Sequence, residues 1–136
     1  MNSFQLRVYF GDTDAIGVVY HANYLDFSEK ARTEISRMHG LDIIELAKKG
    51  LFFLVRSASL NYMAPAKLDD ILDIEIVITK FGNTSVEMLH KIKNFKTNQL
   101  LCEVICNLVF VEKVNGEIKS CKISEDIKEK LKLLTV

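Results

Sequence analysis

The sequence lacks an excess of charge of either sign and any long apolar run. Its 18 Lys and Arg residues equal its 18 Asp and Glu residues, so overall charge does not favour nucleic acid or a membrane surface as a partner. No apolar run approaches the roughly 18 residues that a membrane span needs. The segment Met1 to Arg7 lacks the basic stretch and apolar run of a targeting signal. We therefore expect a cytoplasmic protein without an integral membrane segment.

Cysteine is scarce, with three residues in all. Cys102 and Cys106 lie four positions apart in a predicted strand, roughly 13 Å at the usual rise, which is too far for a disulfide. They share an alternating apolar face with Val104, Leu108 and Phe110, which predicts buried, reduced thiols. Neither a zinc-type Cys/His spacing nor a glycine-rich nucleotide loop occurs, so we predict no metal and no cofactor.

Linkers, internal repeats and low-complexity segments are also lacking. The single proline, Pro65, lies in the loop Met63-Ala64-Pro65-Ala66-Lys67. The chain has 136 residues, of which 49% are hydrophobic and 26% are charged. This length and balance are typical of one folded domain with a substantial core, so we expect residues 1–136 to form a single domain.

Hydrophobic periodicity predicts a strand from Phe4 to Phe10, followed by a helix from His21 or Ala22 to Met38 that ends before Gly40. Six residues of this helix recur at three- and four-residue steps and predict a buried stripe: Tyr24, Phe27, Ser28, Ala31, Ile35 and Met38. A second, short helix is expected over Asp42 to Lys49.

After Leu51 the period changes to two. Four strands are predicted, over Leu51 to Tyr62, Ile71 to Lys80, Thr84 to Phe95 and Gln99 to Lys113. Asn115-Gly116 predicts a tight turn into a short strand near Ile118, and Ser124 is a suitable cap for a last helix. This order predicts an α+β fold in which a curved antiparallel sheet of about five strands wraps around one long helix.

The segment from Phe10 to Tyr24 carries Asp12, Asp14, Gly17 and His21 directly before the long helix. Together with the continuation Leu25 to Glu34, it resembles the signature of the hotdog-fold acyl-CoA thioesterases in the 4-hydroxybenzoyl-CoA thioesterase superfamily. The most similar branch is the YbgC-like one, which is associated with the bacterial Tol-Pal system. The resemblance covers nearly the whole chain and implies the hotdog fold.

Thioester hydrolysis needs a group that activates water or attacks the carbonyl carbon, and donors that stabilise the oxyanion. By resemblance, Asp14, three residues before Gly17, is the catalytic carboxylate, as nucleophile or as general base. The backbone amide at His21 polarises the carbonyl next to a helix N-terminus, and the His21 imidazole is a further catalytic candidate. Taken alone, Asp12 and Asp14 are common loop or capping acids, and we expect Asp12 to hold the loop together.

Other residues of the signature have ordinary explanations. Packing suffices for Tyr24 and capping for Asn23, while Tyr20 completes the match as a substrate-binding candidate beside Gly17. Another hotdog branch uses an acid on the central helix. Here we expect Glu29 to be solvated or to pair with Arg32 at three-residue spacing.

The coenzyme A portion of a substrate needs exposed strand backbone and donors for phosphates. The predicted turn Lys80-Phe81-Gly82-Asn83-Thr84-Ser85 resembles the turn that meets CoA in this family, so Lys80, Gly82, Asn83, Thr84 and Ser85 are candidate substrate-binding residues. Lys67 follows the family pattern in the Pro65 loop. As bare sequence, both segments read equally as a hairpin turn and a loop.

The resemblance implies hydrolysis of acyl-CoA to a free carboxylic acid and CoA. Two alternatives stay open: an enzyme acting on acyl carrier protein thioesters, and a non-catalytic subunit of a membrane-maintenance complex. An exposed sheet edge and the resemblance together predict a homodimer or homotetramer whose active sites are shared between subunits. The sequence does not identify the length of the acyl group, because Phe52, Phe53, Met63 and Met88 can each line a pocket or fill the core.

Overall fold

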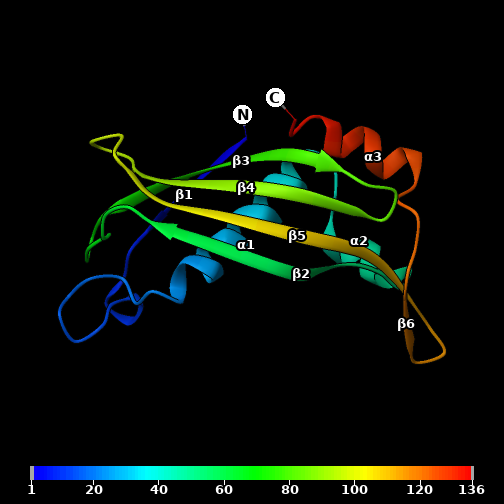
Figure 1. Cartoon of the computed structure of the whole chain (residues 1–136), viewed down its shortest axis with the longest axis horizontal. Coiled ribbons are helices and arrows are strands. Elements are labelled where there is room, and N and C mark those ends of the chain that lie inside the picture. The colour runs from blue at the N-terminus through cyan, green and yellow to red at the C-terminus, as the bar shows by residue number, and fades with distance from the viewer. Residues whose placement is uncertain (1, 136) are drawn as a thin grey trace.

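The computed structural model describes residues 2–135 and contains one mixed arrangement of strands and helices (Figure 1). Its elements, in chain order, are β1 Ser3–Arg7, the 3-10 turn η1 Phe10–Asp12, α1 Asn23–Met38, α2 Ile43–Lys48, β2 Leu51–Tyr62, β3 Ile71–Phe81, β4 Ser85–Asn94, β5 Leu100–Val114, β6 Glu117–Ser120 and α3 Glu125–Lys132. The α+β class is therefore confirmed.

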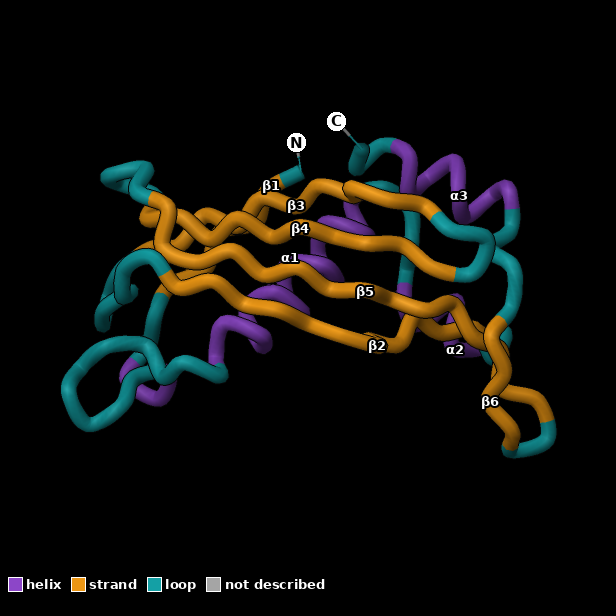
Figure 2. Tube along the Cα trace, in the orientation of Figure 1, coloured by secondary structure: helices purple, strands orange, loops and turns teal. Residues whose placement is uncertain are grey.

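The strands form one antiparallel sheet in the order β1-β3-β4-β5-β2, with the short β6 paired to β5. Figures 1 and 2 show the sheet curving in front of α1, which lies behind its middle strands. α2 and α3 gather near the end of the sheet where β2 begins and β3 ends. This is the curved sheet around a long helix that the sequence predicts.

The core lies between α1 and the concave face of the sheet. In β3 and β4 every second residue is buried, as expected for strands with one covered face. From α1, Tyr24, Phe27, Ser28, Ala31 and Ile35 are buried, and full burial of a side chain such as Phe27 or Ile35 contributes about 1.5–3 kcal/mol. The predicted stripe is wrong at Met38, which is 59% exposed. The covered part of α1 therefore ends one turn before the helix does.

Most predicted boundaries agree with the structure to within two residues. The predicted Leu51 to Tyr62 strand is β2, and the second short helix begins after Asp42, whose side chain accepts a hydrogen bond from the Ile44 N–H. Ser124 caps α3 by accepting from the Ile127 N–H. Asn115 and Gly116 both have positive φ angles, of 51° and 82°, as the predicted tight turn requires.

The first strand is shorter than predicted. It ends at Arg7, and Phe10 instead begins η1. The cause is local, because the Tyr9 N–H donates to the Asp12 carboxylate at 2.9 Å and the Asp12 N–H donates back to the Tyr9 carbonyl at 3.0 Å. These two bonds bend the chain away from the sheet, where a strand would have continued.

A polar cluster of Arg32, His90 and Cys106 lies within the core. His90 is fully buried on β4, and its Nδ1 is 2.9 Å from the Val104 carbonyl oxygen. That contact assigns the proton to Nδ1 and leaves Nε2 free to accept from Arg32 Nη1 at 3.3 Å. Arg32 Nη1 also reaches Cys106 Sγ at 3.5 Å. Arg32 turns inward to the sheet and forms no ion pair with Glu29, which is exposed. The expectation of a solvated Glu29 is therefore confirmed, and the alternative of a pair with Arg32 is wrong.

The pKa of His90 is lowered to about 4, mainly by burial. The Val104 hydrogen bond partly opposes this shift, and the nearby Arg32 charge adds to it. The same burial raises the pKa of the Cys106 thiol. Both groups are therefore neutral near pH 7, so Arg32 is the only charged member of the cluster. Cys102 and Cys106 are buried free thiols, as predicted.

The depressed pKa of His90 gives a prediction for stability. Between pH 6.5 and about 4, His90 binds a proton in the unfolded chain but stays neutral in the folded chain. The free energy of unfolding therefore falls as pH falls through this range. We expect a loss of roughly 2 kcal/mol between pH 7 and pH 5, measured by urea unfolding. His90→Gln should be less stable at pH 7 but should lose much of this pH dependence. An unchanged slope in the variant would assign the effect to other groups.

Candidate active site

The signature segment forms a small hairpin between η1 and α1. Thr13 and Val19 pair as an isolated antiparallel bridge. At the tip, the Asp14 N–H donates to the Val18 carbonyl at 2.8 Å, and the Gly17 N–H donates to the Asp14 carbonyl at 3.1 Å. Gly17 has a φ of +85°, a conformation that residues with a side chain rarely adopt. The hairpin therefore depends on glycine at this position.

Asp14 lies at this exposed tip. One of its carboxylate oxygens, Oδ1, accepts a hydrogen bond from the Ile16 N–H at 2.9 Å, which is an Asx-type contact within the turn. Among residues 2–135, Oδ2 has no hydrogen-bond or ion-pair partner, and no bond joins the side chains of Asp14 and His21. The Asp14 carboxylate is thus oriented by the loop backbone and keeps one oxygen available.

Asp12 has a structural role in the same loop. Its carboxylate accepts from the Tyr9 N–H, and its carbonyl accepts from the Tyr20 N–H and from Asn23 Nδ2, each at 2.9 Å. Asp12 therefore links the start of the loop to the start of α1, in agreement with the sequence interpretation. Asn23 acts through this loop contact, where the sequence suggested helix capping.

His21 lies two residues before the start of α1. The helix begins at Asn23, slightly later than predicted, and its N-cap residue Ala22 provides no side-chain cap. Within the described chain, the His21 N–H donates to no acceptor. The first N–H groups of a helix point out of its end and carry partial positive charge. At this end the Asn23 and Leu25 N–H groups donate to the Tyr20 and Ala22 carbonyls. The His21 N–H, just before the N-cap, is the donor left free beside the positive end of α1 in the described chain.

A hollow of about 260 Å³ opens beside this helix end, lined by Val19, His21, Tyr24, Tyr62, Met63, Ala64 and Pro65. The Tyr62 hydroxyl donates to the His21 carbonyl at 2.9 Å, and the Tyr24 hydroxyl accepts from the Ala66 N–H at 3.2 Å. Burial raises the pKa of Tyr24, so its phenol stays neutral. These two tyrosines fix the helix start against the end of β2 and the Pro65 loop. The Tyr20 ring lies over the His21 ring, with centroids 4.5 Å apart.

The two predicted CoA-contact segments lie at different ends of the molecule. Lys67 forms an isolated bridge with Val18, so it is brought next to the Asp14 hairpin. The turn between β3 and β4, which holds Gly82 to Ser85, lies at the far end of β3. That strand has 11 residues, which is roughly 35 Å at the usual rise. One subunit therefore does not bring Lys80, Gly82, Asn83, Thr84 and Ser85 together with Asp14.

Hydrogen bonds fix the conformation of this turn between β3 and β4. The Gly82 N–H donates to the Ser85 carbonyl at 2.7 Å, and a Cβ at Gly82 would come within 2.8 Å of Ser85 Oγ. The Thr84 and Asn83 carbonyls accept from the N–H groups of Phe110 and Ile123. A side chain at position 82 would therefore require the Ser85 hydroxyl to move, whereas the backbone contacts there are of ordinary length.

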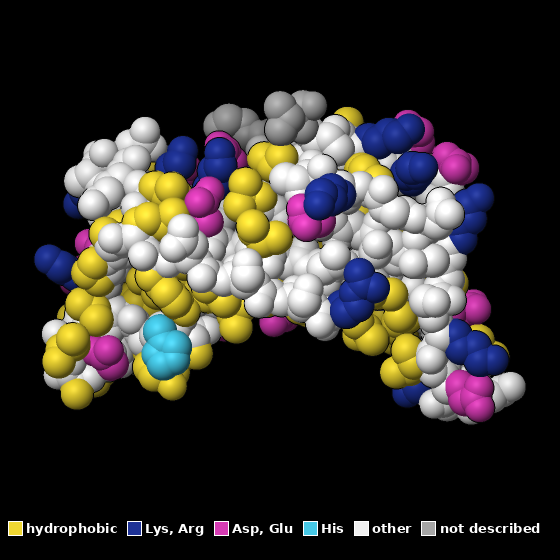
Figure 3. All heavy atoms as spheres, in the orientation of Figure 1, with side chains coloured by type: hydrophobic (Ala, Val, Ile, Leu, Met, Phe, Trp, Pro, Cys, Tyr) yellow, Lys and Arg dark blue, Asp and Glu magenta, His cyan; other side chains and the backbone are white. Residues whose placement is uncertain are grey.

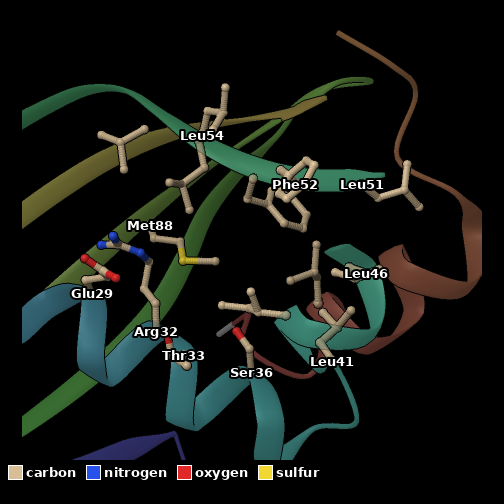
Figure 4. A pocket seen from close by; sticks show the side chains of 15 residues that line it. Glu29, Arg32, Thr33, Ser36, Leu41, Leu46, Leu51, Phe52, Leu54 and Met88 are labelled. Atoms are coloured by element: carbon tan, nitrogen blue, oxygen red, sulfur yellow. The ribbon is translucent and has the colours of Figure 1, made fainter. Parts of the chain in front are cut away.

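Near this turn, a cleft of about 300 Å³ opens between α1, α2 and the first half of β2. Figure 4 shows Leu41, Leu46 and Leu51 at one end of this cleft and Glu29 and Arg32 at the other. The lining residues are mainly apolar and include Phe52, Phe53 and Met88. Of the four residues left open as pocket or core, these three line the cleft, whereas Met63 lines the hollow at His21.

The sequence did not indicate three residues of these sites. Arg32 and its partner His90 lie at the cleft, and Tyr62 lies at the hollow beside His21. His90 alternates with Met88 and Ile92, both of which are buried, so its inward orientation was readable from the period of β4. The partners of Arg32 and Tyr62 were not readable, because each contact joins residues more than 40 positions apart.

Two further features concern metal binding and membrane insertion. Residues 2–135 contain no group of three or more His, Cys, Asp and Glu side chains arranged to hold a metal ion. None of the helices in this part of the chain has the length and apolar character needed to cross a membrane. The expectations of no metal and no cofactor stay predictions.

Comparison with known proteins identifies the family. Residues 8–131 match the family model of the thioesterase-like superfamily. The chain is 44% identical over 107 residues to the acyl-CoA thioester hydrolase YbgC of Escherichia coli O6:H1, covering 79% of each protein. It is 42% identical over 85 residues to the acyl-CoA thioesterase YbgC of Haemophilus influenzae, covering 62% of each.

Solved structures agree with the hotdog fold. A probable thioesterase from Bartonella henselae is 32% identical, with a TM-score of 0.79 over 88% of this chain and 97% of that one. The 4-hydroxybenzoyl-CoA thioesterase of a Pseudomonas species is 22% identical, with a TM-score of 0.86 over 94% and 96%. The chain therefore has the hotdog fold and belongs to the thioesterase-like superfamily, with YbgC proteins among its relatives.

Proposed function

We propose that the protein is an acyl-CoA thioesterase that hydrolyses acyl-CoA to a carboxylic acid and CoA. The observation that carries this proposal is the arrangement at the start of α1. Among residues 2–135, the His21 backbone N–H has no acceptor and one Asp14 carboxylate oxygen has no partner. Both groups belong to the segment between η1 and α1, which the Tyr62 hydroxyl holds against β2. The relatives named as acyl-CoA thioester hydrolases support the same substrate class.

In the proposed reaction, the His21 N–H donates to the thioester carbonyl oxygen, and the positive end of α1 stabilises the oxyanion that forms there. Asp14 acts on the carbonyl carbon in one of two ways. As a general base, it accepts a proton from the attacking water. As a nucleophile, it forms an anhydride that water then cleaves. In both, the C–S bond breaks and CoA leaves as the thiolate, with no redox step and no cofactor.

The active form is proposed to be a dimer joined through β2, which is an edge strand. Residues 54 to 59 in its middle are all exposed. Val55 and Ala58 pair with the buried Leu108 and Cys106, so they share the concave face, yet Val55 is 49% exposed. α1 packs chiefly over β1, β3 and β5. In Figure 3, hydrophobic side chains are visible along the lower edge of the molecule, below the sheet, and over the N-terminal loop. A second copy would cover this uncovered surface.

Such a dimer would also complete the site. Antiparallel pairing of two β2 strands, centred on the exposed segment, sets Leu51 of one copy opposite the partner's Tyr62. Leu51 lines the cleft and Tyr62 lines the hollow at His21. The cleft of one subunit would then receive the acyl group of a thioester held at the other subunit's His21 and Asp14. The turn from Lys80 to Ser85 would lie on the same side as this cleft and contact CoA.

By the same resemblance, we propose that two dimers pair into a tetramer and that the protein is cytoplasmic and associated with the Tol-Pal system. Acyl carrier protein thioesters are the contrasting substrate, and a thiol-release assay that compares them with acyl-CoA of equal chain length tests the choice. Release from acyl-CoA alone supports the proposal, whereas release from carrier protein alone would replace it.

We expect Asp14→Asn to lower the hydrolysis rate by at least about 100-fold, because the amide keeps the shape of the side chain but cannot serve as base or nucleophile. The fold should survive, since the carbonyl oxygen of the amide can still accept from the Ile16 N–H. Asp12→Asn is the matched control and should mainly lower the melting temperature. If Asp14→Asn kept more than about a tenth of the rate, the assignment would fail.

His21→Ala should lose about 10- to 100-fold in rate while keeping measurable turnover. The substitution leaves the backbone N–H, the end of α1 and the Tyr62 contact to the residue 21 carbonyl in place. Steady-state kinetics beside Asp14→Asn checks this. Equal losses in the two variants would mean that the imidazole itself is essential.

Light scattering at low micromolar concentration should give a mass of two or four chains. Ala58→Glu places a charge on the uncovered concave face of β2 and should reduce both the mass and the turnover. Gln5→Glu adds the same charge to β1, at the opposite edge of the sheet, and should change neither. Full activity from a monomer of Ala58→Glu would contradict a shared site.

A further inference from the structure

We propose that Arg32 makes the cleft specific for acyl groups that end in a carboxylate, so that the preferred substrates are mono-CoA thioesters of dicarboxylic acids. The proposal rests on the proposed thioesterase function and on the cleft as the acyl site. It adds the chemical class of the acyl group and a residue that selects it.

Within residues 2–135, one nitrogen of this guanidinium forms hydrogen bonds and the other two do not. Nη1 donates to His90 Nε2 and approaches Cys106 Sγ. Nη2 and Nε donate to no acceptor among residues 2–135, and no carboxylate oxygen in that range lies within 4.0 Å of the group. The same residues include no enclosed polar side-chain atom without a partner. The free N–H groups therefore face open space, and Arg32 lines the cleft.

The contacts of Nη1 hold the guanidinium in place. His90 is fully buried, its Nδ1 is fixed by the Val104 carbonyl, and its Nε2 offers a lone pair to Arg32. Because both His90 and Cys106 are neutral, the cluster carries an uncompensated positive charge inside a mainly apolar wall. A half-buried charge without a counter-ion is costly, and a carboxylate is the partner that a guanidinium binds best, through two parallel hydrogen bonds.

The rest of the cleft suits a short hydrocarbon chain. Its walls come from Leu41, Leu46, Leu51, Phe53 and Met88, and its volume is about 300 Å³. Figure 4 shows the Arg32 side chain leaving α1 towards Met88, at the end of the cleft away from Leu41 and Leu46. A purely apolar acyl group would fill the walls but leave the free guanidinium N–H groups to water. A terminal carboxylate would satisfy both parts.

Among the described residues, Glu29 is the one acidic side chain that lines the cleft. Its oxygens lie more than 4.0 Å from Arg32, since the two form no ion pair, and the residue is exposed. Water screens an exposed carboxylate more than a half-buried cation, so attraction by Arg32 outweighs repulsion by Glu29. Removal of the Glu29 charge should then strengthen the preference for a dicarboxylic acyl group.

The test measures kcat/KM for dicarboxylic mono-CoA thioesters of four to eight carbons against monocarboxylic thioesters of equal length. An ω-hydroxyacyl-CoA serves as a neutral polar contrast. The wild-type protein should favour the best dicarboxylic thioester by about tenfold or more over its monocarboxylic match, as expected for hydrogen bonds to a charged group. Because the readout is a ratio on one preparation, a partly unfolded variant does not distort it.

Four variants separate the causes. Arg32→Gln should lower the ratio by about 10- to 100-fold, while Arg32→Lys, which keeps the charge but loses the planar fork, should fall in between. Glu29→Gln should raise the ratio. Lys30→Gln removes the same charge as Arg32→Gln from a surface position that pairs with Asp26, and it should leave the ratio unchanged.

The outcomes distinguish this inference from the proposed function. If no acyl-CoA is hydrolysed, the proposed function itself fails. If monocarboxylic or hydroxyacyl thioesters are hydrolysed best, or if Arg32→Gln leaves the ratio unchanged, the assignment of Arg32 is overturned while thioesterase activity stands. If Arg32→Gln instead dissociates the assembly without changing the ratio, Arg32 has its partner across the subunit contact and not in the substrate.

Discussion

The packing of α1 against the concave face of the sheet is the interaction on which the other features depend. This packing buries Phe27, Ala31 and Ile35 and fixes where the helix starts along its own axis relative to the sheet. Tyr24 and Tyr62 then fix that start laterally, through the Ala66 N–H and the His21 carbonyl. A backbone donor at a helix end stabilises an oxyanion only if the helix cannot shift. The burial that stabilises the fold is thus also the source of positional accuracy at the candidate site.

Much of the fold was predictable because it depends on local periodicity and local chemistry. The alternation in β3 and β4, the caps at Asp42 and Ser124 and the Asn115-Gly116 turn each involve residues close in sequence. The errors occurred where a local preference met a specific contact. The strand propensity of Tyr9 and Phe10 lost to the two hydrogen bonds between Tyr9 and Asp12. Met38 had the right spacing for the core but lies where the sheet no longer covers α1.

The candidate site was predictable in part. Asp14, Gly17 and His21 lie within eight residues of one another, so one segment of sequence carries the motif and its turn. The Arg32, His90 and Cys106 cluster depends on how α1 is placed over β4 and β5, which periodicity cannot give. Likewise, the turn from Gly82 to Ser85 was expected near the substrate. Within one subunit the length of β3 separates it from Asp14, and only a second copy can bring the two together.

The incomplete cover of the sheet by α1 has opposite effects on stability and on function. One helix is too narrow to cover the concave face of all five main strands, so β2 keeps apolar residues such as Val55 in contact with water. This exposure lowers the stability of an isolated subunit, since apolar area left in water contributes nothing to folding. The same uncovered strip, however, borders the cleft and the hollow at His21. A second subunit that covered β2 would bury this apolar area and so stabilise the fold. It would leave the cleft between α1, α2 and the start of β2 open. Under that arrangement, the surface that destabilises the single chain is the surface that forms the substrate site.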